Sequence, residues 1–581
     1  MRVNQTSFSA IVIGLSLLLI YRPGLALAVS AQPEKPSPIS KAPLRRQLDK
    51  LDKSDFRALT RNAQTGLDYF KSGELDLARE KFEASIRQAR QSGNSIALAS
   101  ALTNLGNVKS ALEQFDGAKI DYLESAKVAA ENRLHNIAAR AYANAARNEV
   151  IQGHRESAVA LLHSVYEQIK PLAETREKAE LLLGIGHLLQ PSGFEKTQIK
   201  PASEWSYQAL IEGIKSAENL SLDDLRAYGY GYLGALYLNQ SRLAEALELT
   251  GRAEFVAQSI SRPDILFRWQ WQTGRILAKQ GARVEAIAAY RRAVATLQPI
   301  RGELRTSTVT PNLSSSIDDL YVELADLMLQ GQKLSEAELL AVRDVIEHGK
   351  AEELEDYYHD DCVAAWLGKA SRIDHLADRT AALYPIMLPD RLELLLSLPN
   401  GLQRYTVYRN RADVRKMVEQ LRVTLENRST PEFLPHAQAL YDWLIKPVLA
   451  DLVKNRIETL VFVPDASLRT IPLAALHDGK DFLVRRYAVA TSPGLTLTDP
   501  HPIQRENTRA LLAGLSEGSQ GFQALPNVRD EIRRIAEQFP ATVLEDQSFR
   551  VSNMSRQLLE NPYRIVHIAS HGQFNRNIAD T

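Results

Sequence analysis

The stretch Gly66-Leu67-Asp68-Tyr69, followed by Ala78, Phe82 and Ser85, sets a pattern that recurs along much of the chain. The frame starts again at positions 106, 146 and 186, so four successive copies are spaced 40 residues apart. The matching residues are Leu105-Gly106, Ala118, Tyr122 and Ser125; Ala146, Ala158 and Leu162; Gly186; Leu233-Gly234, Tyr237, Ala246 and Thr250; Gly274, Leu277, Ala286, Tyr290 and Ala293; and, more weakly, Ala325, Leu329 and Ala337. A fixed period of this size indicates stacked helical hairpins.

The residue types in this frame have a physical purpose. A small residue on the first helix and an alanine on the second let the two backbones approach, and a large aromatic one turn later fills the gap to the next hairpin. Short turns that contain glycine separate the helices, as expected where a helix ends. They are Lys71-Ser72-Gly73-Glu74, Gln152-Gly153-His154 and Gln280-Gly281-Ala282. One hairpin cannot bury its apolar face alone, so the copies must stack into an α-solenoid.

Residues 56–350 therefore resemble the tetratricopeptide (TPR) repeat, lengthened from about 34 residues to 40. The loop from Pro191 to Pro201 interrupts the fourth copy. The resemblance implies a protein or peptide partner bound on the concave surface of the stack. The alternative is a spacer that only positions the domain after it.

The composition narrows the function classes. Lys plus Arg equals Asp plus Glu at 70 each, so no basic surplus predicts binding to nucleic acid. The single cysteine, Cys362, excludes a disulfide within the chain. The sequence has no Gly-rich phosphate loop ending in Gly-Lys-Ser/Thr, and we expect no cofactor.

The N-terminus predicts export. Arg2 precedes an apolar segment, Phe8 to Ile20, that is too short to span a bilayer comfortably, and Ala26-Leu27-Ala28 is typical of a cleavage site. We expect a signal peptide at 1–28, a linker at 29–55, and a periplasmic or extracellular protein with no other membrane contact. The alternative is an uncleaved anchor, which the charge and proline at Arg22-Pro23 disfavour.

After a connecting helical segment at 351–380, the pattern changes at residue 381 to short β-type runs alternating with helices, which predicts a parallel α/β sheet. The expected strands are Ala381–Leu388, Leu392–Leu398, Gln403–Tyr408, Thr459–Val463, Phe482–Thr491, Ala510–Leu515, Thr542–Leu544 and Ile565–Ser570. The expected helices are Arg411–Glu426, Leu434–Val453, Asn527–Phe539 and Val551–Glu560. In such sheets the functional residues gather at the carboxyl ends of the strands.

The last expected strand ends in Ser570-His571-Gly572. His571 at this position can act as general base and acid for a nucleophile on a neighbouring strand, and Gly572 permits a tight turn. His567 and His571 are four residues apart, but on a strand this places the rings roughly 13 Å apart, too far to share a metal ion. No metal site is expected there, nor at Asp360-Asp361, which we interpret as a solvated helix end.

Residues 381–581 resemble the CHAT domain, a caspase-like module found attached to TPR arrays. The resemblance rests on Val461-Phe462-Val463-Pro464-Asp465-Ala466-Ser467-Leu468, Ile471-Pro472-Leu473-Ala474-Ala475-Leu476, Asp478-Gly479, Phe482-Leu483, Ser492-Pro493-Gly494 and Val566-His567-Ile568-Ala569-Ser570-His571-Gly572. It implies a caspase-like fold with a His–Cys dyad, in which His571 is the histidine and the Gly572 N–H helps to bind the oxyanion.

The family's cysteine follows the next strand, and no cysteine follows His571 in this sequence. Cys362 precedes the domain and does not match the catalytic position. We therefore expect an incomplete domain without its nucleophile: a fragment, half of a split gene, or a decayed copy. The strand at 565–570 would then leave a backbone edge unpaired. Two hypotheses follow: a cysteine peptidase whose given chain is inactive, or a non-enzymatic interaction scaffold with a vestigial protease domain.

Overall fold

The computed structural model describes residues 53–190, 200–301, 313–331, 333–358, 378–426, 430–464, 466–497, 508–519, 521–538 and 540–571. They form two compact units that divide near residue 359. The expected signal peptide, nearly all of the linker, Cys362 and Gly572 lie outside the described residues. Among the helices that are described, none combines the length and the apolar character needed to cross a membrane.

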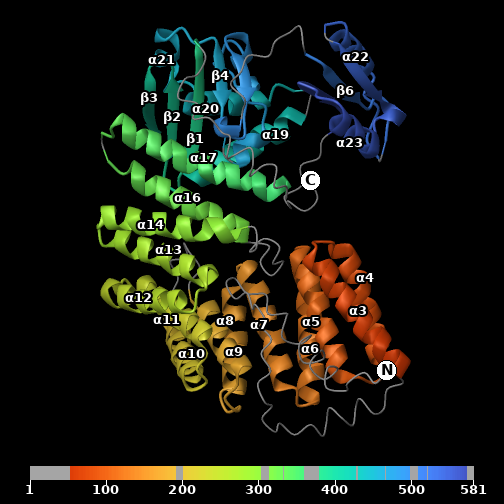
Figure 1. Cartoon of the computed structure of the whole chain (residues 1–581), viewed down its shortest axis with the longest axis vertical. Coiled ribbons are helices and arrows are strands. Elements are labelled where there is room, and N and C mark those ends of the chain that lie inside the picture. Colours follow the sequence, from red (N-terminus) through yellow and green to blue (C-terminus); the bar gives the residue numbers. More distant parts are fainter. Residues whose placement is uncertain are drawn as a thin grey trace. The chain divides into compact units, whose positions relative to one another are not determined.

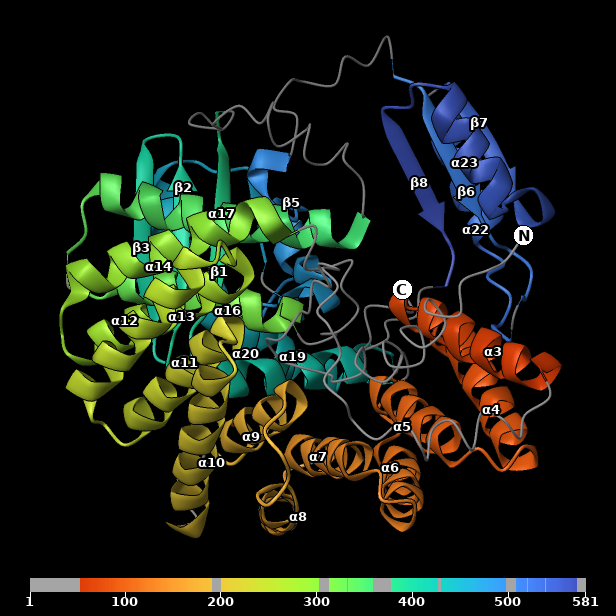
Figure 2. The ribbon, with the colours of Figure 1, turned by 60° about the horizontal axis from the view of Figure 1, so that its bottom comes forward.

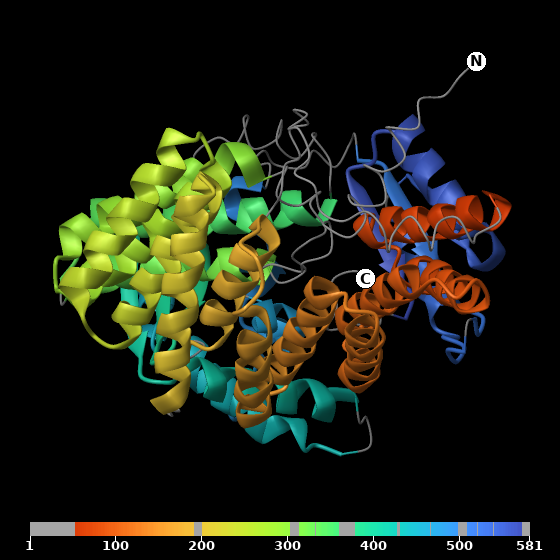
Figure 3. The same ribbon diagram turned by 90° about the horizontal axis from the view of Figure 1, so that it is seen from below.

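The first unit is a stack of antiparallel helical hairpins, and the α-solenoid that the repeats predict is confirmed (Figure 1, Figure 3). Each helix packs against the helices before and after it in the sequence. The helices are α3 (Lys53–Lys71), α4 (Leu75–Gln91), α5 (Ser95–Ala111), α6 (Phe115–Glu131), α7 (His135–Ile151), α8 (Arg155–Ile169), α9 (Arg176–Leu188), α10 (Lys200–Asn219), α11 (Asp223–Asn239), α12 (Leu243–Ser259), α13 (Pro263–Lys279), α14 (Arg283–Leu297), α16 (Leu313–Leu329) and α17 (Glu336–Tyr358).

Three glycines of the repeat frame, Gly66, Gly106 and Gly274, lie directly under an aromatic ring of the second helix of the same hairpin. A Cβ added to Gly66 would lie 2.9 Å from the Phe82 ring, and one added to Gly106 would lie 2.6 Å from the Tyr122 ring. Tyr122 also packs against Ala145 of the next hairpin. The ring therefore fills the space inside its own hairpin as well as the gap to the next hairpin. The sequence pattern had predicted only the second of these two contacts.

The residue at the centre of these turns between helices has the left-handed backbone conformation. The φ angle is +81° at Gly73 and +78° at Gly153 and Gly281, where glycine carries no steric penalty. The equivalent turns without glycine adopt the same conformation, with φ of +57° at Glu113 and +60° at Ser241. Packing of the hairpins thus imposes this turn even where the residue disfavours it.

The second unit contains a five-stranded sheet in the order β3-β2-β1-β4-β5. Its strands are β1 (Thr380–Met387), β2 (Leu392–Leu398), β3 (Gly401–Val407), β4 (Thr459–Phe462) and β5 (Ala488–Thr491). β1, β4 and β5 run parallel, but β1-β2-β3 is an antiparallel meander, so the sheet is mixed and not wholly parallel as predicted. The connections on either side of β2 are too short for the crossover that parallel neighbours require.

Helices α19 (Arg411–Glu426), α20 (Phe433–Leu444) and α21 (Leu449–Lys454) pack with one face of this sheet in a single apolar core. The sequence predicted one helix at 434–453, and the break falls at Pro447, whose ring and missing N–H disfavour a helix interior. The predicted strand at 482–491 is also shorter, because residues Leu483–Arg485 form a 3₁₀ turn before β5 begins.

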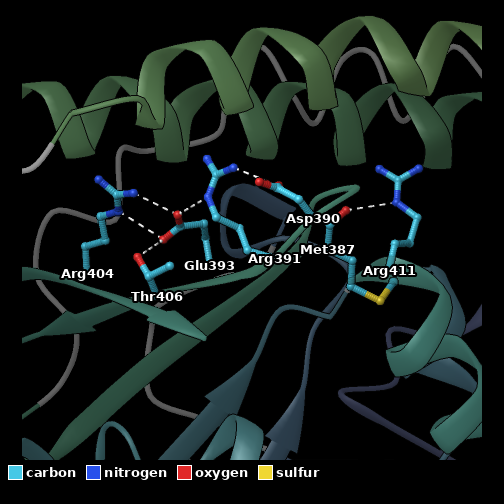
Figure 4. A network of polar contacts seen from close by, with 7 residues as sticks. All are labelled: Met387, Asp390, Arg391, Glu393, Arg404, Thr406 and Arg411. Carbon is cyan, nitrogen blue, oxygen red and sulfur yellow. Dashed lines mark hydrogen bonds and ion pairs between the residues drawn. The ribbon is translucent and has the colours of Figure 1, made fainter. Parts of the chain in front are cut away.

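The opposite face of β2 and β3 carries a buried ion network (Figure 4). The Glu393 side chain is 0% exposed and accepts hydrogen bonds from Arg391 Nε at 2.6 Å, Arg404 Nε at 2.9 Å and Thr406 Oγ1 at 2.9 Å. Burial alone would raise the pKa of the Glu393 carboxyl, but the hydrogen bonds from Arg404, Arg391 and Thr406 outweigh burial and lower it. The carboxylate is therefore charged and neutralised by two guanidinium groups.

A second sheet of three parallel strands has the order β7-β6-β8 (Figure 2). Its strands are β6 (Ala510–Gly514), β7 (Ala541–Glu545) and β8 (Ile565–Ala569), and the helices between them are α22 (Val528–Ala536) and α23 (Val551–Glu560). Residues of α22 pack with Ala510 and Leu512, and Met554 of α23 packs with Leu511 and Ala513, so the helices cover opposite faces.

Candidate active site

Three loops meet at the carboxyl edge of the three-stranded sheet, because parallel strands end on the same side. Ser516 and Glu517 follow β6, Asp546 follows β7, and His571 follows β8. The loop after β6 continues to α22 and carries Phe522 and Gln523. Side chains and backbone groups from all three strand ends are thus available to one site.

His571 lies exposed on this edge and is held on two sides by the loop after β6. Its Nε2 lies 2.7 Å from the carbonyl oxygen of Gln523, and its ring stacks on Phe522 with centroids 5.0 Å apart and planes at 21°. A carbonyl oxygen can only accept a hydrogen bond, so Nε2 must carry the proton. With the proton on Nε2, the lone pair of a neutral ring lies on Nδ1, which is the form that a general base requires.

Asp546 ties the loop after β6 to the end of β7. Its Oδ1 accepts the backbone N–H of Ser516 at 2.7 Å and that of Glu517 at 3.0 Å, while Oδ2 accepts the Ser516 hydroxyl at 2.7 Å and Arg529 Nη2 at 2.9 Å. The Asp546 side chain is 13% exposed. The hydrogen bond from Arg529, followed by that from the Ser516 hydroxyl, lowers the pKa of this carboxyl well below its ordinary value.

The lowered pKa of Asp546 predicts a pH dependence. The unfolded chain takes up this proton near the ordinary value of about 3.9, before the folded chain does, so the contribution of Asp546 to stability is full above about pH 5 and falls as the pH drops through this value and below it. Asp546→Asn removes the titrating group. Chemical denaturation at several pH values should therefore show the wild type losing its advantage over this variant between about pH 5 and pH 3. A constant difference across that range would contradict this assignment.

The remaining predicted residues fall in different places. His567 Nε2 lies 2.9 Å from Glu531 Oε1 of α22, so the two histidines of this strand have separate partners. Gly572 and Cys362 lie outside the described residues. Sequence reasoning missed Gln523, Phe522 and Asp546. Only Asp546 had a usable signal, since it lies two residues after a predicted strand at the functional edge.

The repeat unit offers an open cavity of about 560 Å³. It is lined by Ser203, Glu204, Tyr207, Tyr237, Gln240 and Arg242. The Arg242 guanidinium lies over the Tyr237 ring, with Cζ 4.2 Å from the centroid, and is hydrogen-bonded to Glu245. The cavity combines tyrosine and arginine side chains, two residue types that are enriched where proteins contact a partner.

Residues 434–581, which run from α20 through β4–β8 to the end of the sequence, match the family model of the CHAT domain. The chain carries a CHAT domain. The match includes His571 and the loops that surround it. Together with the stacked hairpins of the first unit, it shows a chain with TPR-like repeats followed by a CHAT domain. Strands β1–β3 precede the matched residues.

Several solved structures resemble the chain at low overall similarity. BtubC (BKLC) from P. vanneervenii is 18% identical with a TM-score of 0.34, and the alignment covers 39% of this chain and 92% of that one. A tetratricopeptide repeat protein from Parabacteroides merdae is 14% identical with a TM-score of 0.31, covering 53% and 97%. A STAND protein with a tetratricopeptide repeat sensor from Pyrococcus horikoshii is 12% identical with a TM-score of 0.26, covering 77% and 71%. No curated protein matches the sequence.

Proposed function

We propose that this chain is an exported TPR–CHAT protein of the cysteine endopeptidase class, in which the repeats recruit a substrate or regulator. In this proposal His571 deprotonates a cysteine thiol to the thiolate that attacks a peptide carbonyl, and then protonates the leaving amine. The Gly572 N–H stabilises the oxyanion that forms on the carbonyl oxygen. The observation that carries the proposal is the imidazole of His571, held by a backbone carbonyl through Nε2 inside the region that matches the CHAT family.

The proposed reaction needs a cysteine thiol, and the sequence has no cysteine close to His571. Cys362 is the one cysteine of the sequence, and it precedes the CHAT match by more than one strand and helix. We propose that the chain as given does not hydrolyse peptides by itself. A specific observation also favours a second function, an interaction scaffold: the stacked hairpins carry an open cavity lined by Tyr207, Tyr237 and Arg242.

The test is peptide hydrolysis by the whole product of the gene, with two single variants. His571→Ala should lower kcat/KM by about 10²- to 10⁴-fold, the usual contribution of a general base. His567→Ala is the matched control, since it removes a histidine from the same strand that pairs with Glu531, and it should change the rate only slightly. Hydrolysis that is unaffected by His571→Ala would contradict the proposed role. Absence of any hydrolysis would favour the scaffold.

A thiol-reactive probe separates the two places from which a nucleophile could come. Labelling of Cys362 should be the same in the wild type and in His571→Ala, because this cysteine precedes the domain in the sequence. Labelling of Cys362 that requires His571 would show that the two side chains meet, and it would overturn the proposal that the thiol comes from elsewhere.

The repeats supply the second part of the proposal. The concave surface of a helical stack is suited to bind an extended polypeptide, and the cavity at Tyr207, Tyr237 and Arg242 could accept one side chain of it. Export by the segment at 1–28 would place this binding in the periplasm or outside the cell. N-terminal sequencing of the protein recovered from cell fractions would test this export. A first residue after position 28 would support a cleaved signal peptide, and an intact Met1 in a membrane fraction would indicate the uncleaved anchor instead.

A further inference from the structure

The loop that holds His571 is itself fixed at both of its ends by specific polar contacts. Ser516, at the start of the loop, donates its N–H and its hydroxyl to the Asp546 carboxylate, and its own carbonyl accepts the N–H of Leu525 at 3.0 Å. Leu525 packs into the core formed by Val528 and Ile532 of α22. Gln523, whose carbonyl oxygen accepts from His571, lies two residues before this second anchor.

We propose that Asp546 is a positioning residue for His571, acting through the loop between β6 and α22. It makes no contact with the imidazole among those that the structure describes. Its carboxylate fixes Ser516 and Glu517, Ser516 fixes Leu525, and the loop between them presents the Gln523 carbonyl and the Phe522 ring to the histidine. This inference rests on the proposed function for what the histidine is held to do.

The charge and the backbone conformation of Asp546 both fit this task. Arg529 of α22 neutralises the carboxylate, so the ends of β6 and β7 and the helix α22 are joined through one group. The φ angle of Asp546 is +47°, in the left-handed region that Asp, Asn and Gly tolerate. Asp546→Asn keeps this conformation and one acceptor oxygen, while Asp546→Gly removes every contact of the side chain without straining the backbone.

The measurement is nuclear magnetic resonance of the full chain labelled with ¹⁵N-histidine, which needs no turnover and no thiol. The readout is the exchange of the His571 Nε2 proton with water, together with the ¹⁵N shifts of the ring, assigned by comparison with His571→Ala. Asp546→Gly should speed this exchange by about tenfold or more, because charged hydrogen bonds that fix the loop are lost. Asp546→Asn should give a smaller increase.

Two controls separate positioning from general loss of structure. Asp530→Asn makes the same charge change on α22, where Asp530 pairs with Arg533 at 2.7 Å, and should leave the His571 ring unchanged. The N–H of Leu515, bonded to the carbonyl of Ala569 at 3.0 Å, reports whether β6 and β8 stay paired. If Asp546→Gly disrupts the pairing of β6 and β8, the Asp546→Asn variant alone decides whether Asp546 positions His571.

The outcomes are distinct. An unchanged His571 ring in Asp546→Asn, with β6 and β8 intact, would overturn the proposal, as would an equal response to Asp530→Asn. A faster exchange in the Asp546 variants alone would support it. Since hydrolysis is not measured, failure of the peptidase proposal would show in the His571→Ala assay and leave this result intact.

Discussion

Replacing Glu393 with alanine is expected to lower the free energy of unfolding of the C-terminal unit by about 3–5 kcal/mol. The substitution leaves the guanidinium groups of Arg391 and Arg404 without the fully buried carboxylate that neutralises them. Buried charges that lose their partner retain the desolvation cost without the compensating attraction. Urea denaturation followed by circular dichroism or by tryptophan fluorescence, with Trp443 of α20 in this unit, measures the change.

Asp390→Ala is the matched control for Glu393. Asp390 contacts the same arginine, Arg391, at 2.9 Å, but its side chain is 72% exposed, so its removal should cost less than about 1 kcal/mol. Equal effects of the two substitutions would show that the burial of Glu393 does not determine the loss in free energy of unfolding. Replacing Glu393, Arg391 and Arg404 together by apolar residues should cost less than Glu393→Ala alone, because the buried carboxylate and both guanidinium groups are then removed together.

Tyr122→Ala is expected to destabilise the hairpin of α5 and α6 by about 3–5 kcal/mol, the usual cost of removing a large buried aromatic side chain. The ring is buried against Gly106, where no Cβ separates it from the backbone of α5, and its hydroxyl donates to Asn107 at 2.8 Å. Removal leaves a cavity between two helices whose spacing was set by the ring. Hydrogen exchange of the α5 and α6 amides measures the local effect, which in a stacked repeat is partly confined to neighbouring hairpins.

Ile120→Ala provides the control on the same helix, because Ile120 is 65% exposed and should change the exchange of these amides little. Gly106→Ala should also destabilise the wild type, since its Cβ would lie 2.6 Å from the Tyr122 ring. In the Tyr122→Ala background the same substitution should be tolerated, because the ring is gone. Additive effects of the two substitutions would contradict the contact described here.

The repeat architecture was predictable because its determinants are local and recur. A frame carries the small residue and the residue that packs on it within one hairpin, as at Gly66 and Phe82, and four successive copies spaced 40 residues apart give a clear pattern. The strands β2 and β8 were likewise close to their predicted bounds. The sheet order and the break at Pro447 were harder to predict from the sequence, since strand pairing and helix continuation depend on long-range packing.

The sequence alone determined the period of the solenoid, the alternation of strands and helices after residue 381, and a histidine at the carboxyl end of the last strand. These features depend on residues close together in the chain, whose spacing dictates which side chains share a face. Only the tertiary structure decided that Gln523 and Phe522 hold this histidine, and that Asp546 fixes their loop. Those contacts join residues 30 to 49 positions apart, and they form only because parallel strands bring their ends to one edge of the sheet.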